Sequence, residues 1–306
     1  MARFRKPDVL VLGGGGILGE AWMTAVLVGL EEATGFDARE CEGYVGTSAG
    51  SIVAAVLSAG VDPRTRLGRM PEQPGVEEVE SVPETGTASR AARRAVMVGR
   101  GAAAPLVAAG LQSVAPGGAF FRRTLLGVVP RGRRSLSGLG DHLERDGARW
   151  DDGRLRVSAV DVKSGRRVMF GAPGAPEASV GQAVEASCAI PGVFEPVRIG
   201  GREYVDGGAW SPTNLDAAPV TNGSRVLCLN PTGAFASPLL AGIGLVSRST
   251  AALEAIALQR QGARVRTIVP DEASVAVIGR NLMDPRPRKA AVEAGLAQGR
   301  AVGRGA

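Results

Sequence analysis

Short apolar runs alternate with helical patterns through the first sixty residues. The four apolar residues 9–12 indicate a buried strand, and a second strand ends at 44–45. The segment 51–59 predicts a small apolar helix closed by Gly60. Within 20–31, apolar residues recur at helical spacing, at Trp22, Val26, Leu27 and Leu30. Repeated strand–turn–helix units of this kind predict a mainly parallel sheet covered by helices.

Strand patterns return after Trp150. Residues 155–160 predict a strand that pairs with 167–170 through a turn at 164–165. Ser179 and Gln182 have the spacing of a capping box, which predicts a helix over 180–187. The remaining elements expected are strands at 204–205, 225–229 and 265–269, helices at 249–261 and 288–298, and a frayed tail after Gly299. The chain is therefore expected to form one domain over 1–306, a three-layer α/β sandwich with a central, mainly parallel sheet.

The region 64–150 has a different character. It is rich in arginine, has proline-containing loops near 71–74 and 81–84, and carries apolar patches between its charges. Such a segment fits a lid or a membrane-facing element. A helical cap that packs on the sheet and exposes its arginines is the interpretation we favour, because charge runs are usually solvated faces.

Charge and cysteine content narrow the function classes. The net charge is +6 and the pI about 9.9, which fits an anionic membrane surface as partner or simply a well-solvated surface. Aromatic residues make up only 4%, so base stacking on nucleic acid is not expected. Three scattered cysteines indicate no disulfide framework and no zinc site. We see no signal peptide, membrane span or metal cluster, and we expect a cytoplasmic protein, at most peripheral to a membrane.

Ser48 has the sequence context of a nucleophile. It follows an apolar strand, precedes a helix of small residues, and is flanked by Gly46 and Gly50. This is the nucleophile-elbow pattern, in which a sharp strand-to-helix turn leaves no room for side chains beside the serine. The serine hydroxyl then projects at a helix N-terminus, where the helix dipole favours negative charge.

A glycine run also lies between a strand and a helix. Backbone N–H groups of Gly14, Gly15 and Gly16 are candidates for holding the oxyanion of an acyl-transfer reaction. The spacing of Gly14, Gly16 and Gly19 also matches a dinucleotide fingerprint, which keeps a dinucleotide-binding oxidoreductase open as an alternative. That fingerprint requires an acidic residue at the end of the second strand, where this chain instead runs into Gly46-Thr47-Ser48. A phosphate-binding loop is excluded because no Gly-Lys-Ser/Thr follows the glycines.

The proton acceptor for Ser48 has two candidates. His142 is the only histidine, and it lies in the basic middle region away from any strand end. We therefore interpret His142 as a surface residue. Asp206 ends a strand and precedes Gly207 and Gly208, which is either a simple turn or the position of a base. Burial would raise the pKa of its carboxyl and make it a better base.

Together these motifs resemble those of the patatin-like phospholipase family. The resemblance rests on the glycine loop, on Gly46-Thr47-Ser48-Ala49-Gly50, and on the sequence segments from Ala186 to Phe194 and from Tyr204 to Asn214. It is weakest over 64–150. The resemblance implies a Ser48–Asp206 dyad without histidine, an oxyanion loop at Gly14–Gly16, and no metal or cofactor.

By the same resemblance, the expected activity is hydrolysis of lipid acyl esters, as in a phospholipase A, a lysophospholipase or a carboxylesterase. One position departs from the family: Leu18 stands where an Arg or Lys is usual. This departure puts phospholipid preference in doubt, and it leaves a catalytically impaired lipid-binding relative as a further alternative.

Overall fold

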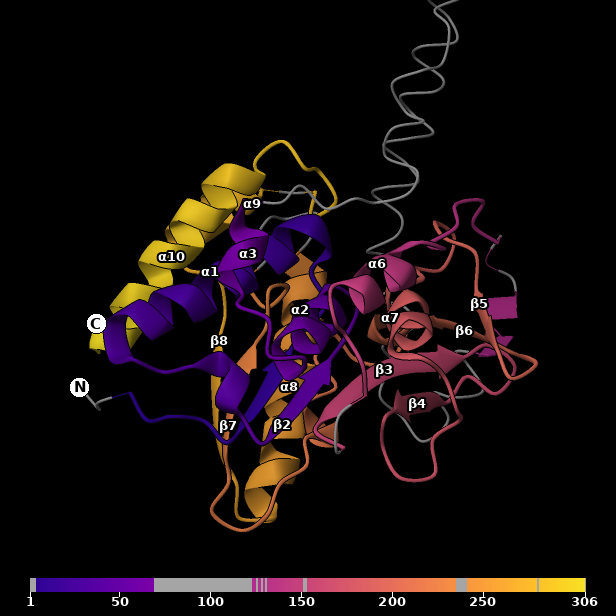
Figure 1. Cartoon of the computed structure of the whole chain (residues 1–306), viewed down its shortest axis with the longest axis horizontal. Coiled ribbons are helices and arrows are strands. Elements are labelled where there is room, and N and C mark those ends of the chain that lie inside the picture. Colours follow the sequence, from indigo (N-terminus) through magenta and orange to yellow (C-terminus); the bar gives the residue numbers. More distant parts are fainter. Residues whose placement is uncertain are drawn as a thin grey trace, which may run out of the picture.

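An eight-stranded sheet is the centre of the described part of the molecule (Figure 1). The computed structural model describes residues 4–68, 123–124, 126–127, 129, 131–150, 153–234, 241–279 and 281–305. The strands are β1 (Val9–Leu12), β2 (Gly43–Gly46), β3 (Leu155–Asp161), β4 (Arg167–Phe170), β5 (Val197–Ile199), β6 (Arg202–Asp206), β7 (Arg225–Leu229) and β8 (Arg264–Ile268). The helices are α1 (Gly16–Thr34), α2 (Ala49–Ser58), α3 (Arg64–Leu67), α6 (Leu139–Arg145), α7 (Val180–Cys188), α8 (Ala241–Arg260), α9 (Glu272–Ile278) and α10 (Arg288–Arg304).

The sheet is parallel in its middle and antiparallel at one end. Its order is β5-β6-β3-β2-β1-β7-β8, and β4 pairs with β3. The four pairings β3–β2, β2–β1, β1–β7 and β7–β8 are parallel. The pairings of β3 with β4, β3 with β6, and β5 with β6 are antiparallel. The predicted mainly parallel sheet is therefore confirmed, with an antiparallel extension beyond β3.

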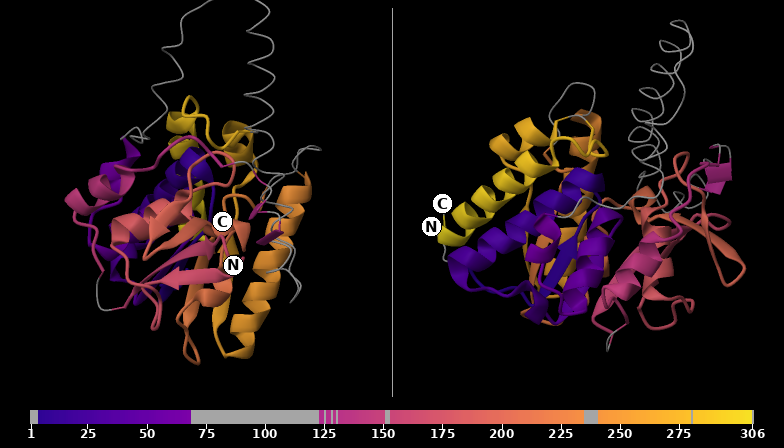
Figure 2. Two further views of the ribbon diagram at one scale, coloured as in Figure 1. Left: turned by 90° about the vertical axis from the view of Figure 1, so that its right-hand side faces the viewer. Right: turned by 45° about the horizontal axis from the view of Figure 1, so that its top comes forward.

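The alternating side chains of β1 divide between two cores, which makes the fold three-layered. Leu10 and Leu12 join the larger core, which contains α1, α2, α7 and α10. Val9 and Val11 point to the opposite face and pack in a second core that includes Leu258 of α8. Figure 2 shows α8 running along the outer flank of the sheet, away from α10. The expected α/β sandwich is present.

The last helix continues past the point where the sequence analysis expected fraying. α10 reaches Arg304 because its glycines let it pack closely on α1. A Cβ atom on Gly299 would lie 2.3 Å from the Val26 carbonyl oxygen, and one on Gly29 would lie 2.4 Å from the Leu296 oxygen. Glycine at the end of the chain therefore marks a close helix–helix contact, and the prediction of a frayed tail was wrong.

Most predicted elements appear, with boundaries shifted. The hairpin β3–β4 and the capping box of α7 are confirmed. α1 begins four residues earlier than predicted, at Gly16, and α8 begins at Ala241 rather than near 249. Sequence analysis missed β5 and α9. Most of the 64–150 region lies outside the described residues, so its interpretation as a cap or lid stays a prediction. Among the helices the structure describes, none is both long and apolar enough to span a bilayer.

Candidate active site

Ser48 occupies a strained turn between β2 and α2. Its backbone has φ 51° and ψ −125°, a left-handed φ that non-glycine residues rarely adopt. The flanking glycines leave room for the turn: a Cβ on Gly46 would lie 2.4 Å from the Ser51 Cα, and one on Gly50 would lie 2.0 Å from the Leu12 oxygen. The Ser48 N–H donates to Ser187 Oγ of α7 at 2.8 Å. This is the geometry of a nucleophile elbow.

The register of the sheet brings Asp206 to this turn. On one edge of β3, Val157 pairs with Gly46 of β2. Two residues further along β3, Ala159 pairs with Asp206 of β6. The other edge of β3 is occupied by β4, which also pairs with Val157. Hence β6 takes over the edge that β2 leaves, and Asp206 arrives beside the residues that follow Gly46.

Asp206 is buried, and its carboxyl interacts with the Ser48 side chain. Burial is the largest effect on its carboxyl and raises the pKa from 3.8 to about 6, while hydrogen bonds from the Ser48 side chain and the Gly208 N–H work in the opposite direction. The Gly208 N–H donates to Asp206 Oδ1 at 2.6 Å. A Cβ on Gly207 would lie 2.1 Å from Ser158 Oγ, so the turn after Asp206 requires glycine there. The arrangement can accept a proton from Ser48 near neutral pH.

The glycine loop lies against the same turn, but its N–H groups are not equivalent. Gly14 is next to Ser48, since a Cβ on Gly14 would lie 3.5 Å from Ser48 Cβ. Its N–H donates to the Pro212 carbonyl at 2.8 Å and is therefore engaged within the fold. Gly15 caps α1 and Gly16 is its first residue, so neither N–H has an acceptor within the helix. Of the three glycines predicted to hold an oxyanion, Gly14 is thus the one whose N–H is engaged by a backbone carbonyl among the described residues.

The supporting glycines and Leu18 have packing roles. A Cβ on Gly15 would lie 2.7 Å from Pro231, and one on Gly19 would lie 3.2 Å from the same ring. Leu18 is completely buried in the larger core, and its N–H donates to the Leu282 carbonyl at 3.0 Å. The side chain at the position that departs from the family thus points into the protein interior.

His142 lies apart from this arrangement. It is on α6, where its Nε2 is 3.4 Å from an Asp146 carboxylate oxygen, and its side chain is partly exposed. The carboxyl whose pKa responds to the Ser48 side chain is that of Asp206. Among the described residues, no group of three His, Cys, Asp or Glu side chains could hold a metal ion.

Two further polar residues near the site were not singled out from sequence. Ser187 lies within the motif segment from Ala186 to Phe194. Nothing in the sequence reveals that its hydroxyl accepts a hydrogen bond from the Ser48 N–H. Glu254 is buried in α8, and its carboxylate accepts from Thr213 Oγ1 at 2.6 Å and from the Leu215 N–H at 2.9 Å. Burial raises the pKa of Glu254. A single glutamate in an apolar helix pattern signals burial only after the fold is known.

A family model for patatin-like phospholipases matches residues 10–219. The chain belongs to the patatin-like phospholipase family. The matched range contains Ser48, Asp206 and the glycine loop, and the family is one of ester-hydrolysing enzymes. Membership removes the support for a dinucleotide-binding oxidoreductase, in agreement with β2 leading directly into the serine turn.

Solved structures similar to this patatin-like chain include two bacterial effectors. The first is VipD from Legionella pneumophila, with a TM-score of 0.44 and 15% identity over 97% of this chain and 66% of that structure. The second is the type III effector ExoU, with a TM-score of 0.41 and 16% identity over 99% of this chain and 53% of that one. The chain therefore spans about two thirds or less of the length of these structures. No curated protein matches the chain in sequence.

Proposed function

We propose that this patatin-like chain is a serine acyl hydrolase that cleaves lipid acyl esters with Ser48 as nucleophile and Asp206 as base. The observation that carries the proposal is a buried carboxylate of raised pKa that interacts with the Ser48 side chain. A serine hydroxyl needs such a partner to become nucleophilic. Perturbed carboxylates are concentrated at catalytic sites, where burial tunes them toward the working pH.

The reaction then proceeds in two acyl-transfer steps. Ser48 Oγ attacks the ester carbonyl while its proton passes to the Asp206 carboxylate. The protonated Asp206 returns this proton to the departing alcohol, which leaves an acyl group on Ser48 Oγ. A water molecule attacks the acyl-enzyme, gives one proton to Asp206, and releases the fatty acid. The proton then returns to Ser48 Oγ, so both residues end the cycle unchanged.

Charge on the tetrahedral intermediate is held by the N-terminus of α1 in this proposal. The N–H groups of Gly15 and Gly16 serve as donors, assisted by the helix dipole. Gly14 lies beside Ser48, but its N–H is already engaged by the Pro212 carbonyl. Backbone donors of this kind lower a barrier by about 2.7–4 kcal/mol each. Because these donors belong to the backbone, the Leu18 departure does not remove them.

The test is hydrolysis of a p-nitrophenyl acyl ester series by four proteins. Wild type and His142→Ala are expected to turn over alike, and Ser48→Ala and Asp206→Ala to fall to background. Full activity in Ser48→Ala would refute the proposal. Loss in His142→Ala with retention in Asp206→Ala would replace the dyad by a histidine-containing triad. A wild type that binds lipid vesicles but hydrolyses none of the esters would favour a catalytically impaired relative.

A lipid substrate also calls for contact with a membrane surface, and we infer that α8 provides it. The most exposed large hydrophobic side chains of the described residues all lie on this helix: Leu245 (60% exposed), Leu253 (58%) and Ile256 (44%). Arg248 and Arg260 are exposed on the same helix, and its one acidic residue, Glu254, is buried. Apolar side chains beside cations, without exposed carboxylates, suit an anionic lipid surface.

Vesicle flotation checks this surface. Wild type is expected to float with phosphatidylglycerol vesicles more than with phosphatidylcholine vesicles, and the double variant Leu253→Ser/Ile256→Ser to lose most of that binding. Hydrolysis of a short soluble ester should be unchanged in the double variant, since α8 packs on the face of the sheet opposite to α2. Equal flotation of the two proteins would rule out α8 as the contact.

A further inference from the structure

One buried asparagine lies between the chain segments that carry the two proposed catalytic residues. Asn214 is fully buried, at the start of the short 3-10 turn Leu215–Ala217. Its backbone φ is +49°. Among the described residues, the only other non-glycine residue with positive φ is Ser48. Such conformations cost about 1–3 kcal/mol and persist where surrounding contacts determine them, which makes Asn214 worth explaining.

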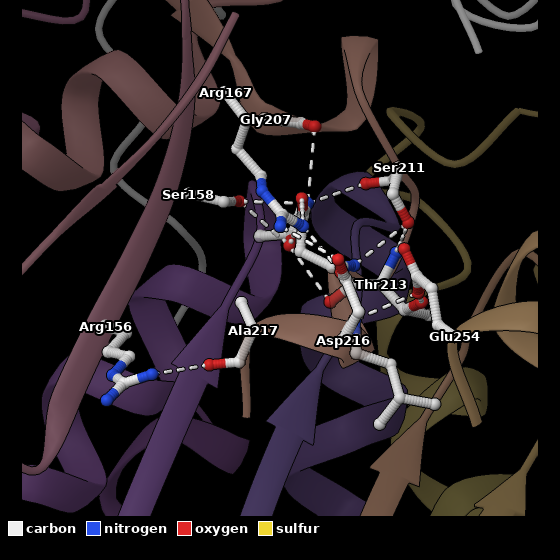
Figure 3. A network of polar contacts seen from close by, with 12 residues as sticks. Arg156, Ser158, Arg167, Gly207, Ser211, Thr213, Asp216, Ala217 and Glu254 are labelled. Atoms are coloured by element: carbon white, nitrogen blue, oxygen red, sulfur yellow. Dashed lines mark hydrogen bonds and ion pairs between the residues drawn. The ribbon is translucent and has the colours of Figure 1, made fainter. Parts of the chain in front are cut away.

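The side-chain amide of Asn214 has four acceptors around it. Its Nδ2 lies 3.0 Å from Thr47 Oγ1 and 3.2 Å from Ser158 Oγ. It also lies 3.3 Å from the Gly207 carbonyl oxygen and 2.8 Å from the Ser211 carbonyl oxygen. In Figure 3, Ser158, Gly207 and Ser211 surround the centre of this network. An NH₂ group carries two hydrogens, so it can donate in two of these directions at once.

These acceptors belong to the turns that hold the dyad. Thr47 directly precedes Ser48, and Gly207 directly follows Asp206. Ser158 lies on β3 between Val157 and Ala159, which pair with Gly46 and Asp206. Its Oγ donates to Thr47 Oγ1 at 3.0 Å. One amide group therefore contacts the serine turn, the aspartate turn and the strand that sets their register.

Asn214 is itself held from the other side. Its Oδ1 accepts from Arg167 Nη1 at 3.2 Å, and Arg167 also pairs with Asp216, with Nη2 at 2.8 Å from Oδ2. The Asn214 N–H donates to Ser211 Oγ at 3.0 Å. The neighbours on either side, Thr213 and Leu215, are both bonded to the Glu254 carboxylate. The amide is thus oriented by contacts that leave its NH₂ facing the two turns.

We propose that Asn214 is a positioning residue that fixes the separation of Ser48 and Asp206 by tying Thr47 to Gly207. The inference rests on the proposed function. It predicts that loss of the amide slows the chemical step without weakening substrate binding, because the residue acts through the dyad. A displacement of about 1 Å between reacting groups can reduce the rate by about 100-fold.

Two variants of Asn214 separate positioning from folding. Asn214→Gly removes the side chain and accepts positive φ without strain. Asn214→Asp keeps the shape and the acceptor for Arg167 but presents an oxygen to Thr47 and Gly207. The matched control is Asn230→Ala, a buried asparagine whose Oδ1 accepts from Thr232 and Ser247.

The measurement is kcat and KM for a soluble p-nitrophenyl ester, with melting temperature and the rate of Ser48 labelling by an alkyl fluorophosphonate. Both Asn214 variants should lose about 100-fold in kcat, with KM within about twofold and labelling slowed in parallel. Asn230→Ala should keep wild-type kcat and labelling. A folded Asn214 variant whose kcat and labelling match those of Asn230→Ala would overturn the proposal, whatever its melting temperature.

The outcome for Asn214 is separable from that for the proposed function. Wild-type turnover that disappears in Ser48→Ala supports the proposed hydrolase, whatever the result for Asn214. If wild type shows no turnover, the proposed function and the proposal for Asn214 are both refuted. If neither Asn214 variant folds, Thr47→Val removes one of the acceptors with little change in shape. It is expected to lower kcat about tenfold, and a folded Thr47→Val protein with wild-type kcat would refute the tie between the two turns.

Discussion

The Asp206 carboxylate lies beside the Ser48 side chain because β2 and β6 pair with the same edge of β3, one after the other along that strand. Gly46 ends its pairing at Val157, and Asp206 pairs two residues further on, at Ala159. The serine follows β2 in a strained turn, just where β6 ends at the aspartate. The proximity of two residues far apart in sequence thus follows from the length of one strand and the register of its two neighbours.

Replacing Asp206 by asparagine should separate activity from stability. The raised pKa of Asp206, about 6 against 3.8, means that the folded state holds the ionised carboxyl at a cost. This free-energy cost of folding is absent below pH 3.8, grows as the pH rises to 6, and is constant above pH 6. It then amounts to about 3 kcal/mol, because each unit of difference between the two pKa values corresponds to about 1.36 kcal/mol. Asp206→Asn is therefore expected to be more stable than wild type at pH 7.5, by up to this amount, and to lose about 10²–10⁴-fold in kcat.

Urea unfolding at pH 7.5 and at pH 4 checks the stability part of that prediction. The gain from Asp206→Asn should shrink at pH 4, where the carboxyl is mostly protonated in the folded state. Asp216→Asn is the matched control, since Asp216 pairs with Arg167 and its loss should destabilise the protein. A variant less stable than wild type at both pH values would contradict the assignment of Asp206 as a buried, costly carboxylate.

The pH dependence of hydrolysis should report the same carboxyl. Only ionised Asp206 can accept the Ser48 proton, so kcat/KM is expected to fall about tenfold per pH unit below about 6 and to level off above it. The profile should be unchanged in His142→Ala, which removes the only histidine. It should also be unchanged in Glu254→Gln, which removes another buried carboxyl of raised pKa. An inflection near pH 4 would show that Asp206 is not desolvated.

Local patterns were sufficient to predict most of the fold. The apolar run of β1, the capping box of Ser179 and the hairpin of β3 with β4 each depend on residues close in sequence. β5 is only three residues long, and α9 is a short helix capped by Asp271, so neither has a strong periodic pattern. The glycines of α10 look like chain-end fraying until α1 is placed against them. β5, α9 and the end of α10 were not predicted because contacts with segments distant in sequence, rather than local patterns, determine their structure.

The sequence named the candidate site residues, but it did not show the contacts between them. Glycines around Ser48 and after Asp206 are visible in sequence because sharp turns need them. The engagement of the Gly14 N–H by Pro212, the Ser187 contact with Ser48 and the Asn214 amide all join segments distant in sequence. No spacing rule reveals such pairs from one chain. Which glycines hold an oxyanion is likewise a question of hydrogen bonds already made within the fold.

The strain at Ser48 should be measurable apart from catalysis. Both Ser48→Ala and Ser48→Gly remove the hydroxyl, but only glycine accepts φ 51° without a steric penalty. Ser48→Gly is therefore expected to exceed Ser48→Ala in stability by about 1–3 kcal/mol. Urea unfolding of the two inactive proteins provides the measurement. Gly68 is the control position, because its φ is negative and a Cβ there would lie in open space. Gly68→Ala is expected to be more stable than the protein with glycine at this position, by less than about 1 kcal/mol. Equal stability of the two Ser48 variants would show that the turn relaxes.

Restoring the basic residue that the family usually has at position 18 should harm this chain. Leu18 is completely buried in the larger core, where a lysine would place a charge among apolar side chains. Leu18→Lys is expected to cost at least about 3 kcal/mol in stability, because an unpaired buried charge is left without water. Leu18→Met is the control of similar volume and should cost less than about 1.5 kcal/mol. Thermal unfolding and ester hydrolysis of both variants provide the test. A stable Leu18→Lys protein with raised activity on anionic phospholipid would instead show that position 18 can turn its side chain toward the oxyanion loop.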